Sequence, residues 1–340
     1  MKDRAVSSIN AINILKVLWQ HSDRNNALTQ KQIIAALDDD YKIDRKTVGR
    51  TIEKLCDVFN TSSLPIKIKY HCKDDDGDIE NHYKGVYLEK PFKDSELRLL
   101  IDSVLTSRHI NSDDSKELIK KLCMLSNRDS SSLFKRVNTV NNIQKTEAKG
   151  LFDNIDILSK AIEKQKKVSF DYIKYRDGAK STKGRSHVVS PYELWLHGQY
   201  YYLISNDEEK GKTNFRVDRI ENVKILTEHR IPFEDVYGKK EDFPYKKMTT
   251  AYPYMFTDEP QRIEFLLHED IRGDVFDYFG NAATITAQPD GKYKVSVYTS
   301  PMAMEIWALK YLMWVEILSP QSLRDKIIED LKGATAKYKI

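Results

Sequence analysis

Two strand-like runs between residues 190 and 220 constrain the fold more than any other feature of the chain. Residues 200–204 and residues 215–220 are rich in aromatic and β-branched side chains, and the polar residues 206–212 separate them. Such runs, divided by a short polar segment that contains a glycine, are typical of two antiparallel strands joined by a turn. The stretch therefore predicts a strand, a turn and a second strand.

The same stretch holds more than a plain hairpin requires, because its second run contains two arginines, Arg216 and Arg219, and its first is a run of tyrosines. Its parts follow in the order proline, leucine, glycine, an aromatic-Tyr-Leu triplet and a Phe-Arg-x-x-Arg segment. This order resembles the WYL domain of bacterial transcription regulators. Tyr201-Tyr202-Leu203 stands at the Trp-Tyr-Leu position, so a tyrosine replaces the tryptophan of the family's motif.

Length and composition favour a folded protein of several domains. The 340 residues include 55 basic and 51 acidic side chains, so the net charge is only +4. Cys56, Cys72 and Cys123 lack the CxxC spacing of a zinc site and suit a reducing compartment. The N-terminus is amphipathic, unlike a signal peptide, and no apolar run approaches the roughly 20 residues of a membrane helix. We therefore expect a cytoplasmic protein with no metal, no cofactor and no membrane partner.

Residues 1–90 predict a winged helix-turn-helix domain. Apolar residues recur at helical spacing in residues 8–20, and two further helices follow, with Thr29 and Asp44 as N-cap residues. The third helix presents a basic outer side, on which Gly49 is also expected, and such a helix enters the major groove in helix-turn-helix proteins. The predicted DNA contacts on this helix are Arg45, Lys46, Thr47, Arg50 and Thr51. The alternative is an ordinary solvated helix that carries basic residues.

A predicted hairpin directly after the third helix favours DNA binding. Residues 66–70 alternate strictly between apolar and polar side chains, and residues 83–88 supply a partner strand. Phosphate would repel the acidic tip, residues 74–78, so we expect Lys67 and Lys69 on the flank to face DNA. The tip does not fit a calcium-binding loop, because glycine stands at position 12 of that loop in place of glutamate.

Residues 91–150 predict a helical connector, with Ser95 as a helix cap, followed by a polar linker that holds one element near residues 134–140. The family resemblance implies that this connector helps to form a dimer. Residues 151–235 contain several short strands within about 70 residues, which predicts a small, curved antiparallel barrel. The resemblance implies that this barrel is an Sm- and SH3-like WYL sensor domain.

Residues 236–340 predict an extension of mixed helices and strands. Strands at residues 261–267, 293–298 and 315–318 alternate with helices, which is the pattern of a compact α/β unit. A similar extension follows the barrel in many members of the family that the chain resembles. The fold class expected for the whole chain is therefore α+β with several domains.

The polar residues of the predicted barrel form a candidate effector site. Its members are Tyr172, Arg185, Ser186, His187, Tyr201, Arg216 and Arg219. Arginine forks beside aromatic rings bind phosphates and stacked bases. The resemblance implies that Tyr201, Arg216 and Arg219 bind a nucleotide or single-stranded nucleic acid, whereas the other four join by their positions in the strands.

A purely structural role for the same residues is the alternative. Strict alternation puts Arg216 and Arg219 on opposite faces of a strand unless the strand ends near Asp218. Either arginine then pairs with Asp218 or Glu221 and holds the barrel together, and the tyrosines belong to the barrel core.

The function we predict is transcription regulation. The chain is expected to be a homodimer that binds double-stranded operator DNA, to act as a repressor, and to change its operator binding when the effector occupies the barrel. The alternative is a nucleic-acid-binding accessory protein of a phage-defence or DNA-repair system without its own operator. We do not expect an enzyme, because the sequence lacks nucleophile-elbow, zinc-protease, phosphate-loop and Rossmann motifs.

Overall fold

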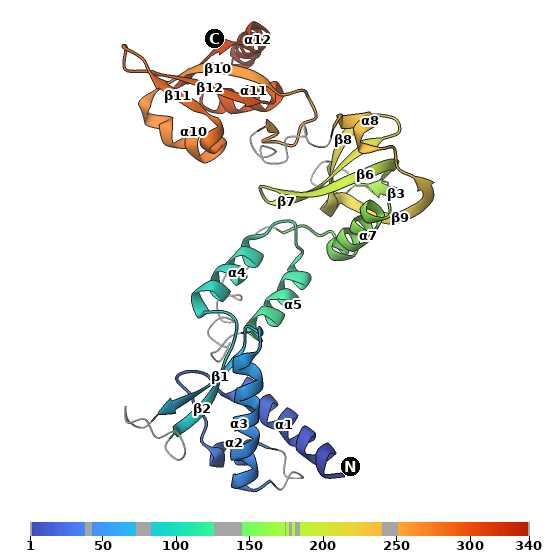
Figure 1. Ribbon diagram of the computed structural model, residues 1–340. Coiled ribbons are helices and arrows are strands. Elements are labelled where there is room, and N and C mark those ends of the chain that lie inside the picture. Colours follow the sequence, from blue (N-terminus) through green and yellow to red (C-terminus); the bar gives the residue numbers. More distant parts are fainter. Residues whose placement is uncertain are drawn as a thin grey trace. The chain divides into compact units, whose positions relative to one another are not determined.

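A computed structural model shows the chain as a series of helices and antiparallel sheets (Figure 1). The structure describes residues 2–37, 43–72, 83–125, 145–173, 175–176, 179–180, 184–239 and 251–338. The predicted acidic tip at residues 74–78 and the predicted linker element at residues 134–140 lie outside these ranges.

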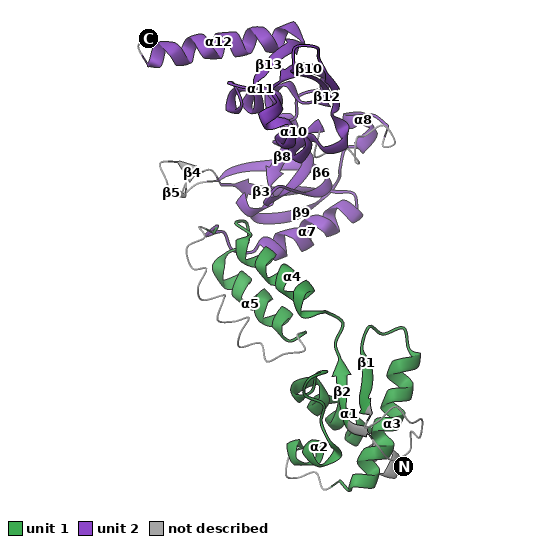
Figure 2. Ribbon diagram, turned by 90° about the vertical axis from the view of Figure 1, so that its left-hand side faces the viewer, with its two compact units in different colours: residues 1–145 green, residues 146–340 purple. Residues whose placement is uncertain are grey.

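Contacts divide the chain into two compact units, residues 1–145 and residues 146–340 (Figure 2). Both units contain helices and antiparallel strands, so the predicted multi-domain α+β class is confirmed. Within the described ranges, no helix combines the length and the apolar character that a membrane span requires. The predicted boundaries at residues 90, 150 and 235 stay a prediction.

The first unit begins with three helices and a two-stranded hairpin. These are α1 (Lys2–His21), α2 (Gln30–Ala36), α3 (Arg45–Thr61), β1 (Lys67–Cys72) and β2 (Tyr83–Glu89). Their apolar faces meet in one core, in which Leu18, Ile52 and Ile68 are fully buried. Leu28, just before α2, forms a β-bridge with Val86 of β2, so the hairpin is hydrogen-bonded to the helical part.

Both predicted N-caps are confirmed. The Thr29 hydroxyl accepts the backbone N–H of Gln32, and the Gln32 side chain accepts that of Thr29, which closes a capping box. Asp44 accepts the backbone N–H of Thr47 at 2.9 Å. Because the first turn of a helix leaves N–H groups without intrahelical partners, these local side chains determine where α2 and α3 begin.

The predicted exposure of Gly49 is wrong. Gly49 is buried in α3 on the side that packs against α2, and a Cβ atom at this position would stand 2.9 Å from Nε2 of Gln30. The absence of a side chain therefore permits a close approach of the two helices. The helical spacing in the sequence places Gly49 beside the exposed basic residues, but it does not indicate that α2 packs against this position.

After the hairpin, the described residues of the first unit form a helical pair, α4 (Asp94–Thr106) and α5 (Ser112–Cys123), which lie side by side around their own apolar core (Figure 1). The predicted cap at Ser95 is wrong, because α4 starts earlier and Lys93 holds the N-cap position. The Glu96 carboxylate accepts the backbone N–H of Lys93 at 2.9 Å. Glu96, three residues after the N-cap, thus holds the start of α4 in place of the expected serine.

The second unit contains a five-stranded antiparallel sheet with the order β8-β7-β6-β3-β9. Within this sheet, the strand that comes last in sequence, β9, pairs with the one that comes first, β3, and α7 packs against β3, β6 and β9. The elements of this part are α7 (Leu151–Glu163), β3 (Lys166–Tyr172), β4 (Tyr175–Arg176), β5 (Ala179–Lys180), β6 (Arg185–His197), β7 (Tyr200–Asp207), β8 (Gly211–Arg216), the 3-10 turn η1 (Val217–Arg219), β9 (Ile220–His229) and α8 (Phe233–Tyr237).

Two boundaries in this sheet differ from the prediction. The polar segment between β7 and β8 covers residues 208–210, because hydrogen-bonded pairing continues to Asp207 on one strand and to Gly211 on the other. The second strand ends at Arg216, and η1 replaces the rest of the predicted strand. Pairing across strands therefore extends β7 into residues whose polarity is typical of a loop.

The predicted alternation of strands and helices in the C-terminal part is confirmed. Its elements are β10 (Gln261–Leu267), η3 (Glu269–Ile271), α10 (Arg272–Phe279), η4 (Gly280–Ala282), β11 (Thr284–Ala287), β12 (Tyr293–Thr299), α11 (Pro301–Lys310), β13 (Val315–Ser319) and α12 (Gln321–Lys337). The strands form an antiparallel sheet in the order β11-β12-β10-β13, and Phe265, Phe279 and Trp307 are buried in its core. The edge strand β11 was not predicted.

We predict that Ile52→Ala destabilises the first unit strongly. Ile52 is fully buried, so its truncation leaves a cavity and costs about 2–5 kcal/mol of the free energy of unfolding. Val58→Ala on the same helix is the matched control, because Val58 is 61% exposed and its loss changes stability by less than about 0.5 kcal/mol. Chemical denaturation followed by circular dichroism measures both, and equal effects would contradict the core described above.

Candidate functional site

The outer face of β6, β7 and β8 brings an arginine, a histidine and three aromatic rings together. Tyr202 lies opposite Arg216 on β8 and opposite Trp195 on β6, and Tyr200 lies opposite His197. Side chains directly opposite each other project from the same face of a sheet, and residues two apart on one strand share that face. The five side chains therefore form one continuous surface, which we call the aromatic face.

Tyr201 does not belong to this surface. It stands between Tyr200 and Tyr202 on β7, so alternation turns its side chain to the opposite face of the sheet. Leu203, on that opposite face, is fully buried beside Phe215. The structure thus separates Tyr201 from Arg216, although the motif match placed both in one site.

Arg216 is held in one orientation by a fork to Asp218. Its Nε and Nη2 atoms donate to the two carboxylate oxygens at 3.1 and 2.7 Å. Its guanidinium carbon lies 3.3 Å from the centre of the Tyr200 ring, which is a stacked arrangement. The Asp218 side chain is 2% exposed and that of Arg216 is 21% exposed. The pairing with Asp218 that the sequence left open is therefore present, and the Arg216 side chain remains partly exposed.

The environment of Arg216 favours its charged form. Burial works against the charged form, but the hydrogen bonds and the negative charge of Asp218 outweigh it and raise the pKa of Arg216. The backbone N–H of Arg216 also donates to the Tyr172 hydroxyl at 3.4 Å. Tyr172 thus links Arg216 to two further predicted effector residues, because it stands opposite Arg185 on β6 and its ring lies edge-on to that of His187.

Arg219 lies outside the alternation of β8, because η1 starts after Arg216. Its carbonyl accepts the backbone N–H of Ile173 at 2.9 Å, and its side chain is half-buried. The strict alternation of faces applies only to a continuous strand. Because β8 ends before Asp218, that alternation does not determine the direction of the Arg219 side chain.

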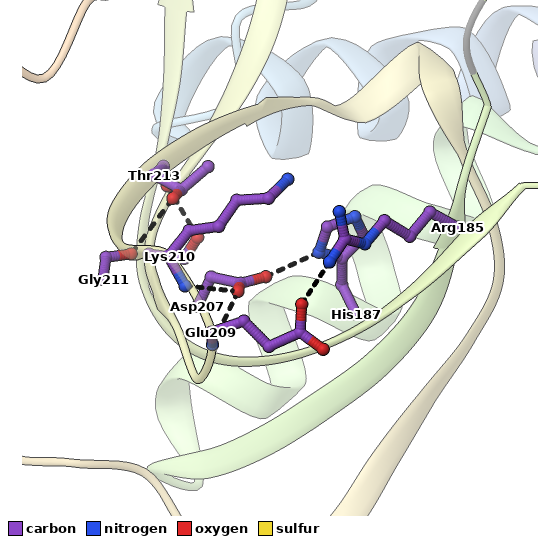
Figure 3. A network of polar contacts seen from close by, with 8 residues as sticks. Arg185, His187, Asp207, Glu209, Lys210, Gly211 and Thr213 are labelled. Atoms are coloured by element: carbon purple, nitrogen blue, oxygen red, sulfur yellow. Dashed lines mark hydrogen bonds and ion pairs between the residues drawn. The ribbon is translucent and has the colours of Figure 1, made fainter.

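His187 and Asp207 form a buried pair at the end of the β7–β8 hairpin (Figure 3). The His187 Nδ1 atom donates to the Asp207 carboxylate at 2.6 Å, and the side chains are 3% and 2% exposed. The other Asp207 oxygen accepts the backbone N–H groups of Glu209 and Lys210, which form the turn. The pair therefore holds the hairpin turn, and the structural role that the sequence left open for His187 is the one that this geometry supports.

The two remaining effector candidates lie at the same end of the sheet. Arg185 is exposed and pairs with Glu209 of the turn (Figure 3). Ser186 is exposed on β6 and stands opposite Asp171 of β3. Sequence proximity to His187 grouped these residues with Arg216, whereas the sheet places them beside the hairpin turn.

The predicted DNA contacts on α3 differ in exposure. Arg45, Lys46 and Arg50 are exposed, and Nε of Arg45 donates to the side chain of Gln30 at 2.8 Å. The Thr47 hydroxyl donates to the capping carboxylate of Asp44 at 2.6 Å. Thr51 is buried and donates to a backbone carbonyl of its own helix. The exposed cations thus remain the stronger candidates for nucleic-acid contact.

The two hairpin lysines have protein partners. Nζ of Lys67 donates to the carbonyls of Phe59, Asn60 and Ser62 at 3.0, 3.3 and 2.9 Å, which closes the C-terminal end of α3. Lys69 forms an ion pair with Glu89 at 2.6 Å on the neighbouring strand. A cation at the last carbonyls of a helix is stabilising. Lys67 therefore fixes the hairpin against α3, and its predicted DNA contact stays a prediction.

Comparison with protein families identifies the part of the chain that holds the aromatic face. Residues 153–225 match the family model of the WYL domain. The chain contains a WYL domain. The recognition made from the Tyr201-Tyr202-Leu203 triplet and the Phe-Arg-x-x-Arg segment is therefore confirmed, and β3, β6, β7, β8 and β9 supply its five-stranded sheet.

Solved structures give weaker similarities. Proteasome accessory factor B/C (PafBC) of Arthrobacter aurescens is 16% identical, with 97% of this chain and 49% of that chain covered and a TM-score of 0.29. A structure described as a CRISPR Cas-related protein is 15% identical, with coverage of 91% and 76% and a TM-score of 0.37. The chain spans about half the length of the PafBC chain. The search of curated proteins found no significant match.

We predict a pH-dependent stability of the WYL domain through Asp207. Burial raises the pKa of this carboxyl, but the hydrogen bonds from His187 and from two backbone N–H groups outweigh it, so the folded-state pKa lies below the ordinary value. Its stabilising contribution is therefore complete above the unfolded-state pKa of about 3.9 and is lost as the pH falls through the lower, folded-state pKa.

The measurement compares the wild type with Asp207→Asn by urea denaturation between neutral and strongly acidic pH. The difference in free energy of unfolding should be constant above about pH 5 and shrink below about pH 4. Asp171→Asn serves as the control, because Asp171 is only half-buried and pairs with the side chain of Asn222, which carries no charge. A wild-type advantage that persists unchanged at acidic pH would contradict this role of Asp207.

Proposed function

We propose that the chain is a cytoplasmic, homodimeric transcription regulator that binds operator DNA and senses a nucleotide or a single-stranded nucleic acid at the aromatic face of its WYL domain. In this proposal it represses its target and acts by binding, without catalysis. The observation that carries the proposal is the geometry of Arg216, whose guanidinium is fixed by Asp218 and stacked on Tyr200, and whose side chain is partly exposed.

Arg216 has the chemistry for an effector that carries rings and phosphates. Guanidinium groups bind phosphate oxygens and stack on planar rings, and five N–H groups are available on each. The fork uses two of these groups. Because Asp218 neutralises the charge of Arg216, a ligand gains more from stacking and hydrogen bonds than from net charge. Tyr200 and Tyr202 supply the neighbouring rings, so stacked bases suit this face.

The sheet order supports an Sm- or SH3-like barrel for the WYL domain. Five strands pair in the order β8-β7-β6-β3-β9, and the pairing of β9 with β3 directs the chain back across the sheet after β8. In a small barrel, one face of such a sheet is open to ligands while the other face forms a core. The buried Phe170 and Phe215 lie in that core.

The first unit supports a winged helix-turn-helix. Three helices are followed by a hairpin, and α3 exposes Arg45, Lys46 and Arg50 near its N-terminal end. The N-terminal residues of a recognition helix contact base edges, and cations there also bind phosphates. In a two-fold symmetric dimer, two such helices read two half-sites of a palindromic operator.

We predict that Arg50→Ala weakens binding to the operator. Loss of a base-contacting arginine costs about 1–3 kcal/mol and relaxes specificity at one position, whereas loss of a phosphate contact lowers the salt dependence instead. Fluorescence anisotropy with the duplex upstream of the chain's own gene, at several salt concentrations, separates these effects. Lys16→Ala removes a charge from the exposed side of α1 and is the control. Equal affinities for wild type and Arg50→Ala would favour the accessory-protein interpretation.

We predict that Arg216→Lys abolishes the effector response and leaves operator binding intact. Lysine keeps the positive charge but lacks the fork and the planar surface, so the contacts with Asp218 and Tyr200 are lost. The response is the change in operator affinity on adding short single-stranded DNA. Arg262→Lys, at a site that is 74% exposed on β10, is the control. A normal response in Arg216→Lys would exclude the aromatic face as the sensor.

A further inference from the structure

Residues 251–259 lie across part of the aromatic face, and we call this segment the strap. Nε2 of His197 donates to the carbonyl of Pro253 at 2.6 Å. The side-chain amide of Asn214 donates to the carbonyl of Met255 at 2.9 Å. His197 belongs to β6 and Asn214 to β8, so the strap is attached to two strands of the sheet that carries the candidate effector site.

Apolar contacts and an ion pair complete the attachment. Met255 is buried in a cluster with Tyr192 and Ile204, against which Tyr202 also packs. Nearer its end, Glu259 pairs with Lys212 of β8 at 2.9 Å. The strap and Arg216 thus share Tyr202 as a neighbour, because Tyr202 pairs with Arg216 across the sheet.

The face beneath the strap holds polar atoms that lack partners. Among the residues that the structure describes, none forms a hydrogen bond with the buried Nε1 of Trp195, Nδ1 of His197 or Oδ1 of Asn214. A carbonyl only accepts, so Nε2 of His197 carries the hydrogen, and Nδ1 of the neutral ring is an acceptor. The three atoms therefore offer one donor and two acceptors. Buried polar groups without hydrogen bonds destabilise the arrangement that buries them.

The strap backbone is strained at Met255, one of its buried residues. Met255 has a φ of 57°, in the left-handed region that residues with a side chain rarely adopt. Its backbone N–H is held by the carbonyl of Tyr252 at 2.9 Å. Strain at one residue and missing hydrogen bonds below it both raise the free energy of the attached strap relative to a displaced one.

The strap is also bound to the N-terminal end of α11. Ser300, the N-cap of that helix, donates its hydroxyl to Asp258 at 2.6 Å and its backbone N–H to the carbonyl of Ala251 at 2.8 Å. The second Asp258 oxygen accepts the backbone N–H of Met302 at 3.1 Å. Movement of the strap therefore changes the contacts of a helix in the C-terminal part.

We propose that the strap is a displaceable cover of the effector site, and that an effector bearing a nucleobase replaces it on the aromatic face. This inference rests on the proposed function and adds the regulation of the same site. A nucleobase is planar, and its edge carries donors and acceptors that complement Trp195, His197 and Asn214. The rings of Tyr200 and Tyr202, next to these residues, supply stacking.

Thiol labelling of Met255→Cys measures the displacement. Met255 is 5% exposed, so a cysteine at this position reacts only when the strap moves away. Leu203→Cys is the matched control, because Leu203 is fully buried on the other face of β7 and reacts only when the sheet opens. Peptide mass spectrometry distinguishes the new cysteine from Cys56, Cys72 and Cys123. We expect Met255→Cys to react at least about tenfold faster than Leu203→Cys, as local openings precede global ones.

The ligand for this test is a short single-stranded oligodeoxynucleotide whose binding to the wild type is measured by anisotropy. It should further accelerate labelling of Met255→Cys and leave that of Leu203→Cys unchanged. Glu259→Gln in the same background removes an exposed ion pair, so it should raise the rate about twofold and tighten oligonucleotide binding by a similar factor. Glu163→Gln removes the same charge from the exposed end of α7 and should change neither quantity.

The outcomes separate the strap from the proposed function. If the oligonucleotide binds but labelling is not faster and Glu259→Gln has no effect, the strap is not a displaceable cover. The proposed sensor function would be unaffected by that result. An oligonucleotide that fails to bind the wild type would overturn the proposed single-strand effector. In that case the labelling rates without ligand still test whether the strap is displaceable. Equal rates for Met255→Cys and Leu203→Cys would contradict displacement, and a faster rate for Met255→Cys would support it.

Discussion

The buried carboxylate of Asp218 organises the candidate effector site. It lies in η1, where the chain leaves β8 and turns into β9, and there it accepts both hydrogen bonds of the Arg216 fork. The buried carboxylate without its arginine partner would be strongly unfavourable, because an isolated buried charge is far more costly than a hydrogen-bonded pair. The same turn directs β9 towards β3. The order of the sheet and the orientation of Arg216 thus depend on one short turn.

Much of the fold was predictable because its signals are local. Thr29 and Asp44 cap helices through groups within three residues, and the strand and helix pattern after residue 260 follows from the spacing of apolar side chains. Gly49 and Ser95 show the limit of such signals. The burial of Gly49 depends on where α2 crosses α3, and Glu96 replaced Ser95 in capping α4.

The residues that share the candidate effector face were harder to predict, because the faces of a sheet are set by register. A shift of one residue along β7 exchanges Tyr201 for Tyr200 and Tyr202 beside Arg216. The motif match named Tyr201, whereas the register places Tyr200 and Tyr202 on the face of Arg216, and the sequence alone does not distinguish the three tyrosines. Asp207 was missed for another reason. Its partner His187 is 20 residues away, and only the pairing of β6 with β7 brings the two together.

Sensing requires a part of the protein that binds the effector differently in two states. A ligand that gained the same free energy from the exposed part of Arg216 in both states would shift no equilibrium. In the proposed mechanism the strap supplies the difference, because its displacement opens the buried polar atoms of Trp195, His197 and Asn214 to a ligand. Its far end is hydrogen-bonded to the cap of α11 through Asp258 and Ser300. Ligand binding and the state of the C-terminal part are therefore coupled through one segment, and by reciprocity any contact that loosens α11 from Asp258 also strengthens effector binding.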